Sequence, residues 1–218
     1  MCFSASASFI AGGALSTVGV ATLKKAKKKS EIPFATVPLL FGIQQAIEGV
    51  LWFAFQNNIV LMQSVATFLF SFFAYALWPA FMPFSVRLLE PAPKRRKILS
   101  ILLVIGGAVG LYLLYFIIRY PVLSEINHHS IAYTETVPFG SLLFWVYVIA
   151  GCGSCLVSSH KLINYFGVLS IISIAFAAYL YATSFVSVWC FFAAMLSSIV
   201  YLYFVRKDVK SSNVDLAI

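Results

Sequence analysis

The sequence predicts an all-α integral membrane protein, a bundle of seven transmembrane helices with the N-terminus outside and the C-terminus in the cytoplasm. Three observations predict this fold class. Of the 218 residues, 61% are hydrophobic and 10% are charged, with a mean hydropathy of +0.95, whereas soluble domains carry about 25% charged residues. Apolar stretches long enough to cross the hydrocarbon core of a bilayer recur along the chain. The third observation is where lysine and arginine lie between these stretches.

Seven apolar stretches are expected to form the membrane-spanning helices. They cover residues 4–23, 33–56, 59–86, 97–119, 138–158, 162–182 and 185–205. Each is close to the length of about 20 residues that a helix needs to span a bilayer. We expect one transmembrane domain over residues 1–210 and a short polar cytoplasmic tail over residues 211–218.

The basic residues lie almost entirely in alternate gaps between the stretches. Five lysines lie in the gap from Lys24 to Lys29, five basic residues lie between Arg87 and Lys97, and the other gaps of this set hold Lys161, Arg206, Lys207 and Lys210. The opposite gaps hold only Arg119. Because basic residues flank membrane spans on the cytoplasmic side, this distribution predicts the orientation and a place in a bacterial cytoplasmic membrane. We expect these residues to meet anionic lipid headgroups, so the net charge of +8 does not indicate nucleic-acid binding.

Short motifs indicate an internal repeat of three helices on either side of a linking helix. The pairs are Ile10-Ala11-Gly12 with Ile149-Ala150-Gly151, Phe41-Gly42 with Phe166-Gly167, and Ser64-Val65 with Ser187-Val188. Parallel repeats of this kind occur in transporters. Chance matches between apolar helices are the alternative interpretation. Pro79 and Pro83, inside the third stretch, are expected to kink it because proline removes a helical hydrogen bond.

Glu48 is the residue that a membrane environment makes most unusual. An acidic side chain at the centre of a transmembrane helix costs about 2.5–3.5 kcal/mol on insertion scales, so we expect Glu48 to face the interior of the bundle. Helical spacing puts Gln44, Glu48 and Trp52 on one stripe, with Gln45 beside Glu48. The functional interpretation is a ligand contact, a proton carrier or a general base. The structural interpretation is a polar clamp that is hydrogen-bonded to Gln45 or to a Ser or Tyr of a neighbouring helix.

Aromatic side chains with polar tips gather at the same depth as Glu48. The residues expected to form a ligand-binding pocket are Gln44, Gln45, Glu48, Trp52, Tyr75, Trp78, Tyr112, Tyr179, Trp189 and Cys190. Aromatic walls with a few convergent polar groups are typical of small-molecule sites. The alternative is an aromatic belt at the membrane interface, which most membrane proteins have.

The outer loop from Tyr120 to Val137 contains a weak candidate metal site. If this loop were helical, Glu125, His128 and His129 would share one face, and two imidazoles with a carboxylate suit zinc. A solvated loop is the alternative. We assign no metal and no cofactor.

Small residues inside two stretches are interpreted as helix-packing positions. Gly106 and Gly110 have the GxxxG spacing, and Cys152 and Cys155 lie beside Gly151 and Ser154. Small side chains allow close approach of membrane helices. The spacing of the two cysteines also fits a redox or metal pair. The cytoplasmic end of the span lies in a reducing compartment, which argues against a structural disulfide.

Three motifs resemble those of a family of bacterial multi-pass membrane proteins of unknown function. They are Met1-Cys2-Phe3-Ser4-Ala5-x-Ala7-Ser8-Phe9, Leu40-Phe41-Gly42-x-Gln44-Gln45-x-x-Glu48-Gly49 and Val186-Ser187-Val188-Trp189-Cys190-Phe191-Phe192. The resemblance covers nearly the whole chain. It implies no activity, because the family has none assigned.

Three functional hypotheses follow from these features. The first is a sensor or transporter-like protein that binds a small molecule or lipid around Glu48. The second is a metal-dependent intramembrane hydrolase that uses Glu48 or the outer histidines. The third is a structural subunit that docks other membrane proteins. No catalytic residue is assigned, an enzyme is the less favoured class, and self-association into a homo-oligomer is left open.

Overall fold

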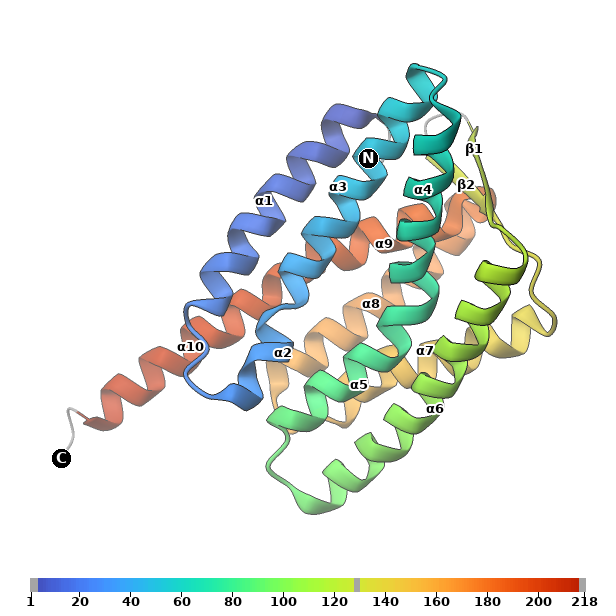
Figure 1. The fold of residues 1–218 in the computed structure, drawn as a ribbon. Helices are drawn as coiled ribbons and strands as arrows, with labels where there is room; N and C mark the ends of the chain where they lie inside the picture. The colour runs from blue at the N-terminus through green and yellow to red at the C-terminus, as the bar shows by residue number, and fades with distance from the viewer. Residues whose placement is uncertain (1–3, 128–129, 216–218) are drawn as a thin grey trace.

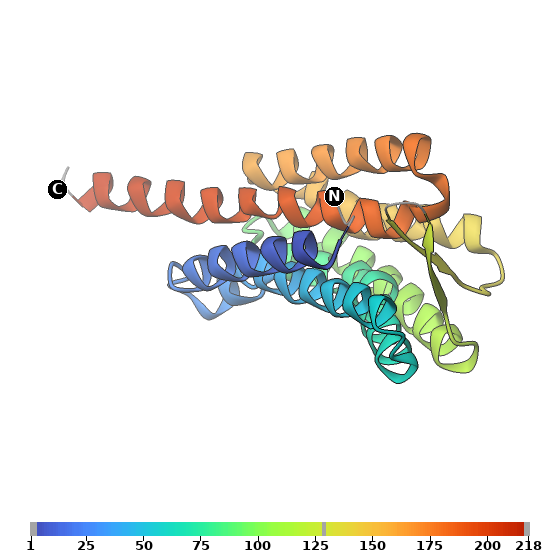
Figure 2. The same ribbon diagram turned by 90° about the horizontal axis from the view of Figure 1, so that it is seen from above.

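The computed structural model describes residues 4–127 and 130–215, and the side chains up to residue 207. Its helices are α1 (Ala5–Leu23), α2 (Ile32–Ala35), α3 (Val37–Gln56), α4 (Val60–Ser71), α5 (Trp78–Leu89), α6 (Pro93–Arg119), α7 (Gly140–Val157), α8 (Lys161–Leu180), α9 (Phe185–Leu196) and α10 (Ser198–Asp215). Within these residues, seven helical units are long and apolar enough to cross a membrane. They match the seven predicted stretches. α10 continues to Asp215, into the predicted polar tail (Figure 2).

Six of the seven spanning units form a ring, and α6 lies outside it (Figure 1). The units contact in the order α1, α3, α4 with α5, α7, α8 and α9 with α10, and α10 returns to α1. α6 packs on the outside of this ring, against α7 and the second half of the third spanning unit. The outward surface is apolar, since Ile10, Leu61 and Val104 are 72%, 76% and 72% exposed. Apolar side chains so fully exposed suit a surface that faces lipid.

The outer loop forms a β-hairpin rather than an open loop or a helix. β1 (Leu123–Asn127) pairs antiparallel with β2 (Ser130–Thr134), with Glu125 opposite Ala132. Glu125 lies in a strand, so the condition on which the candidate metal site depended, a helical loop, is not met at Glu125. His128 and His129 lie outside the described residues. β2 is buried because Ile131 and Tyr133 pack on the ends of the α3 and α4 helices.

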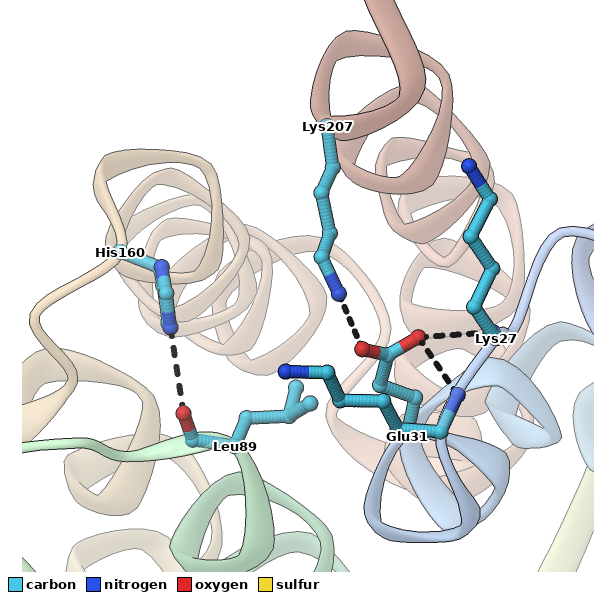
Figure 3. A network of polar contacts seen from close by, with 6 residues as sticks. Lys27, Glu31, Leu89, His160 and Lys207 are labelled. Carbon is cyan, nitrogen blue, oxygen red and sulfur yellow. Dashed lines mark hydrogen bonds and ion pairs between the residues drawn. The ribbon is translucent and has the colours of Figure 1, made fainter. Parts of the chain in front are cut away.

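Hydrogen bonds join the lysine-rich gaps to one another at the opposite end of the bundle. Figure 3 shows the Glu31 carboxylate between the ammonium group of Lys207 and the backbone N–H of Lys27. Nearby, His160 Nε2 lies 3.3 Å from the Leu89 carbonyl oxygen. Because these residues come from four different gaps in the sequence, the basic segments that the sequence separates lie together in the fold. We refer to this end as the lysine-rich end and to the other as the hairpin end.

The third spanning unit is broken near its middle by a π-helical segment, Phe72–Leu77. The break has a local cause. In the π-helical register Trp78 N–H bonds to the Phe73 carbonyl, so the next carbonyl, that of Ala74, would need the N–H of Pro79. Proline has no N–H. The predicted departure from regular helix at Pro79 is thus confirmed, and it takes the form of a π-bulge that frees one carbonyl.

Glycines bring the linking helix close to this break. A Cβ on Gly106 of α6 would lie 1.9 Å from the Pro79 carbonyl oxygen, and one on Gly110 would lie 2.5 Å from that of Ala76. Only glycine permits so close an approach between backbones. The predicted packing role of both glycines is confirmed.

The proposed internal repeat has structural counterparts. A Cβ on Gly42 would lie 2.6 Å from Ser16 Oγ, and one on Gly167 would lie 2.7 Å from Cys155 Cβ. Ser16 lies four residues after Gly12, as Cys155 does after Gly151, so the motif-matched glycines meet motif-matched positions. The ring has the arrangement that two parallel triplets would give, with α5 against α7 and α10 against α1. These contacts support a repeat.

The seventh unit is broken at the position that corresponds to the break in the third. α9 ends at Leu196 and α10 begins at Ser198, with a turn at Ser197. Ser197 lies ten residues after Ser187, as Ala74 lies ten residues after Ser64 in the matched motif. Both third members of the two triplets are therefore interrupted at the same place.

Candidate functional site

The polar residues of α3 point into the bundle, as the membrane environment predicts. Gln44, Gln45 and Glu48 are each 0% exposed. Ser187 of α9 donates a 2.6 Å hydrogen bond from Oγ to Glu48 Oε1. A serine of a neighbouring helix thus holds the carboxyl group, which is the contact expected of a polar clamp. The hydrogen bond joins the first triplet of helices to the second.

Gln44 holds the indole ring that follows the helix break. Trp78 donates a 2.8 Å hydrogen bond from Nε1 to Gln44 Oε1, and its ring stacks on Phe41 with centroids 3.9 Å apart and planes 16° apart. The Gln44 carboxamide also lies beside the thiol of Cys190. Gln44, one turn before Glu48, therefore fixes one aromatic wall while Glu48 fixes α9.

An apolar cavity, which we call the inner cavity, lies in front of these residues at the middle of the ring. Its volume is about 40 Å³, room for about three water molecules and well below the range of about 300–1,000 Å³ that is usual for small-molecule sites. Its wall consists of Phe41, Trp78, Met82, Tyr147, Gly151, Cys152, Cys155, Phe166, Ser170, Trp189, Cys190 and Ala193. The two motif-matched phenylalanines, Phe41 and Phe166, are both in this wall.

The amide and acid side chains of α3 stand behind the wall of the inner cavity. Gln44, Gln45 and Glu48 are not among the lining residues. Trp78 and Cys190 lie between them and the cavity, because Trp78 is bonded to Gln44 and Cys190 lies next to Gln44 and Glu48. Gln44 and Glu48 hence act on the cavity through the side chains that they hold.

Tyr147 satisfies the carbonyl that the helix break leaves free. Its hydroxyl donates a 2.7 Å hydrogen bond to the Ala74 carbonyl oxygen, and the residue is buried. The ring of Tyr147 makes an edge-to-face contact with Trp189, with centroids 5.6 Å apart. One side chain therefore stabilises the break and forms part of the cavity wall.

The other predicted pocket residues lie in separate places. Tyr75 packs against the core beside Trp78, and its hydroxyl donates to Glu135 at the hairpin end, 2.9 Å away. Trp52 lies in a second apolar cluster under the hairpin. Tyr112 of α6 is partly buried, and its ring packs against Phe116 of the same helix, with centroids 4.8 Å apart. Tyr179 is 88% exposed and lies apart from all of them.

Sequence reasoning did not single out several residues of the site. Phe41, Tyr147 and Ser187 were noted only as parts of motifs or of an aromatic layer, and Met82 and Ala193 carry no signal of their own in a single sequence. Cys152 and Cys155 were interpreted as packing residues, and Cys155 does meet Gly167. Both also line the inner cavity, and the thiols of Cys152, Cys155 and Cys190 are free. Ser187 could have been found by looking for a hydroxyl group on another span that could donate a hydrogen bond to Glu48.

The described residues contain no group of three His, Cys, Asp or Glu side chains that is placed to hold a metal ion. Glu125 is exposed on the hairpin, and the two histidines beside it are not described.

The fold and its surface define a helical membrane protein, with seven units that are long and apolar enough to span a bilayer. The model of a "Family of unknown function (DUF6629)" matches residues 1–215, and the chain belongs to this family. No curated protein and no solved structure matches the chain. The first three residues of the opening motif, Met1 to Phe3, lie outside the described part of the chain.

Proposed function

We propose that this protein binds an apolar small molecule or a lipid in the inner cavity, in the manner of a transporter or a membrane sensor. The observation that carries the proposal is the apolar cavity of about 40 Å³ at the middle of the ring, lined by Phe41, Trp78, Phe166 and Trp189. It would have to widen to admit a ligand of more than a few atoms. An aromatic and aliphatic wall gains free energy from an apolar ligand, at about 25 cal/mol for each Å² of apolar surface that is removed from water. Charged substrates would find no counter-charge on this wall.

Gln44 and Glu48 position the wall rather than touch the ligand. Gln44 orients Trp78, and Glu48 holds Ser187, three residues before Cys190. A change in the hydrogen bonding of Glu48 would shift α9 and with it Trp189 and Cys190. Proton uptake or release at Glu48 would by this route alter the cavity.

Two features favour a transporter-like protein over a rigid receptor. Interrupted helices at matching positions of two repeats are typical of transporter binding sites, and both breaks, Phe72–Leu77 and Ser197, lie in helices that supply cavity residues. The two triplets of helices meet where α5 packs against α7 and where α10 packs against α1. Rocking of one triplet against the other at these junctions would open the cavity to one side at a time.

The orientation follows the basic residues. We place the lysine-rich end in the cytoplasm, next to anionic headgroups, and the hairpin end outside a cell membrane. The support is that Glu31, Lys207, Glu90 and Ser159, from four different gaps, meet at one end. A green fluorescent protein fused to the C-terminus should fluoresce, and an alkaline phosphatase fused there should be inactive. The reverse pattern would contradict this orientation.

A cavity-filling substitution tests the binding proposal. A Cβ on Gly151 would meet nothing within 4 Å, because it faces the inner cavity. Gly151→Leu should therefore fill the cavity without forcing the helices apart. Gly153→Leu is the matched control, since it lies two residues away on the same helix and its Cβ meets only Ile149, at 3.9 Å.

The measurement is native mass spectrometry of the protein purified from its membrane, with extraction and identification of any bound molecule. We expect a bound apolar species in the wild type and in Gly153→Leu, and its loss in Gly151→Leu at an unchanged melting temperature. Equal retention by both variants, or an empty wild-type protein, would contradict the proposal. Glu48→Gln should fold, because the amide oxygen still accepts from Ser187, and should alter the occupancy.

A further inference from the structure

A second cavity lies beside the inner one, towards the hairpin end. It has a volume of about 110 Å³ and lies between the π-helical segment, α7, α9 and the residues that precede α7. We call it the outer cavity. Tyr147 and Trp189 line both cavities, so the two share a wall. Unlike the inner cavity, it includes a charged residue, Glu135.

Five aromatic rings line the outer cavity. They are Tyr75, Phe144, Tyr147, Phe185 and Trp189. Four of them make a continuous chain of ring contacts. Phe144 meets Phe185 edge-to-face with centroids 5.6 Å apart, Phe185 stacks on Trp189 at 5.8 Å, and Trp189 meets Tyr147 at 5.6 Å. Because two of these three contacts are edge-to-face, the rings present both faces and edges to the space between them.

Glu135 is the one charged residue of this wall among the residues that the structure describes. It lies between β2 and α7 and is exposed, so its carboxylate is open to solvent at the mouth of the cavity. Tyr75 donates a 2.9 Å hydrogen bond to Glu135 Oε2 and holds the carboxylate in place. The nearest basic residue in sequence at this end, Arg119, lies over the ring of Tyr120 and is not part of the wall.

The indole nitrogen of Trp189 adds a third observation. Nε1 is buried and donates no hydrogen bond in the described part of the protein. Gln44 and Trp78 show the opposite arrangement, in which the indole is tied to a partner. The Trp189 ring is hence positioned by ring contacts alone, as a flat surface rather than as a hydrogen-bonding group.

We propose that the outer cavity is a binding site for an organic cation with an alkylated ammonium head, such as a trimethylammonium group. Aromatic faces attract a cation through the ring quadrupole, and cages of several rings recognise quaternary ammonium groups. The Glu135 carboxylate supplies the counter-charge. An anion would be repelled by Glu135, and an inorganic cation would lack the several oxygen ligands that it requires. The site is separate from the inner cavity that the proposed function uses.

Choline and its uncharged isostere 3,3-dimethyl-1-butanol distinguish charge recognition from hydrophobic binding. Isothermal titration calorimetry of the full-length protein in lipid nanodiscs, at constant ionic strength, measures both affinities. We expect saturable binding of choline and an affinity for the isostere that is at least about tenfold weaker, because only the cation gains from the ring faces and the carboxylate. Equal affinities, or no choline binding at millimolar concentration, would overturn the proposal.

Substitutions locate the site. Glu135→Gln keeps an acceptor for Tyr75 and removes the charge, so choline should bind about tenfold more weakly at an unchanged melting temperature. Glu125→Gln removes an exposed carboxylate from the hairpin at the same end and is the matched control. Trp189→Leu should abolish binding. Equal losses in the two glutamine variants would show a general surface-charge effect and overturn the site.

The inner-cavity variant Gly151→Leu keeps this test independent of the proposed function. Gly151 is not part of the outer wall, so Gly151→Leu should bind choline as the wild type does. An empty inner cavity with intact choline binding would contradict the proposed function alone. Choline binding that fails in the wild type while the inner ligand is retained would contradict the outer site alone.

Discussion

Ser187 and Glu48 face each other across the interface between α9 and α3, with Ser187 Oγ 2.6 Å from Glu48 Oε1. Both residues are fully buried. The hydrogen bond is a polar link between the second spanning unit and the seventh, the two units that also supply Phe41 and Trp189 to the inner cavity. Loss of this hydrogen bond should be costly, because a buried carboxyl group that loses a donor inside the membrane has no water to replace it.

Ser187→Ala should destabilise the protein although it removes a single oxygen atom. Leaving the Glu48 oxygen without this donor costs about 1–3 kcal/mol. The matched control is Ser64→Ala, which alters an exposed serine in the corresponding motif of the first triplet. Unfolding in mixed detergent micelles, followed by circular dichroism, gives the free energy of unfolding. If the two variants were equally stable, the clamp would contribute nothing.

Tyr147→Phe should destabilise the π-helical segment that interrupts the third spanning unit. The hydroxyl of Tyr147 is the donor to the Ala74 carbonyl, which Pro79 cannot serve, and its loss should cost about 1–3 kcal/mol. Tyr165→Phe, at an exposed position of α8, is the control. Hydrogen–deuterium exchange should show faster exchange of backbone amides near Phe72–Leu77 in Tyr147→Phe only. Unchanged exchange there would mean that the break is held by packing alone.

Adjacent glycines of α6 should respond to alanine in opposite ways. A Cβ on Gly106 would lie 1.9 Å from the Pro79 carbonyl oxygen, whereas one on Gly107 would meet nothing within 4 Å. Gly106→Ala must therefore push α6 from α5, and overpacking of this kind costs about 1–3 kcal/mol. Gly107→Ala should be neutral or stabilising by up to about 1 kcal/mol, because alanine favours helix. A shared loss in melting temperature would contradict the close approach.

The sequence predicted the helices well because the cause is local. Each apolar stretch must satisfy its own backbone hydrogen bonds in lipid, so hydropathy alone locates it. The cost of an acidic side chain in lipid likewise predicted that Glu48 faces the interior of the bundle. The hairpin was not predicted, because Ile131 and Tyr133 are buried by contacts with α3 and α4 that no local pattern shows. A short strand cannot be distinguished from a loop in the sequence when its pairing partners are unknown.

The site was predicted in part for a related reason. Periodicity places residues on a face of one helix, so Gln44, Glu48 and Trp52 were grouped together. Across the ring, however, Trp52 faces the hairpin cluster and Tyr179 faces outward, because the rotation of each helix depends on its neighbours. Residues whose role depends on distant partners, such as Tyr147 with Ala74, could not be found without the fold. The glycine contacts of the repeat are visible only once both triplets are in place.

Glu90, at the lysine-rich end, should make stability depend on pH. Its side chain accepts hydrogen bonds from Ser159 Oγ at 2.5 Å, Ser159 N at 2.7 Å and Ala92 N at 3.1 Å. Burial raises the pKa of Glu90, but these hydrogen bonds and the nearby charge of His160 outweigh it, and the pKa lies below its ordinary value of 4.5. Folding therefore favours the ionised form. The stabilisation is fully present above about pH 4.5 and is lost as pH falls through the lower pKa of the folded protein.

Glu90→Gln places an amide N–H₂ group among these donors, so it should lower the free energy of unfolding at pH 7 by about 1.5–3 kcal/mol. It should also flatten the loss of stability that the wild type shows between pH 5 and pH 3, roughly the window that linkage sets for such a carboxylate. Glu125→Gln, on the exposed hairpin, should retain the wild-type profile. Melting temperatures of the three proteins in one detergent across this range decide the matter. A Glu90→Gln profile parallel to that of the wild type would assign the acid sensitivity to other carboxylates.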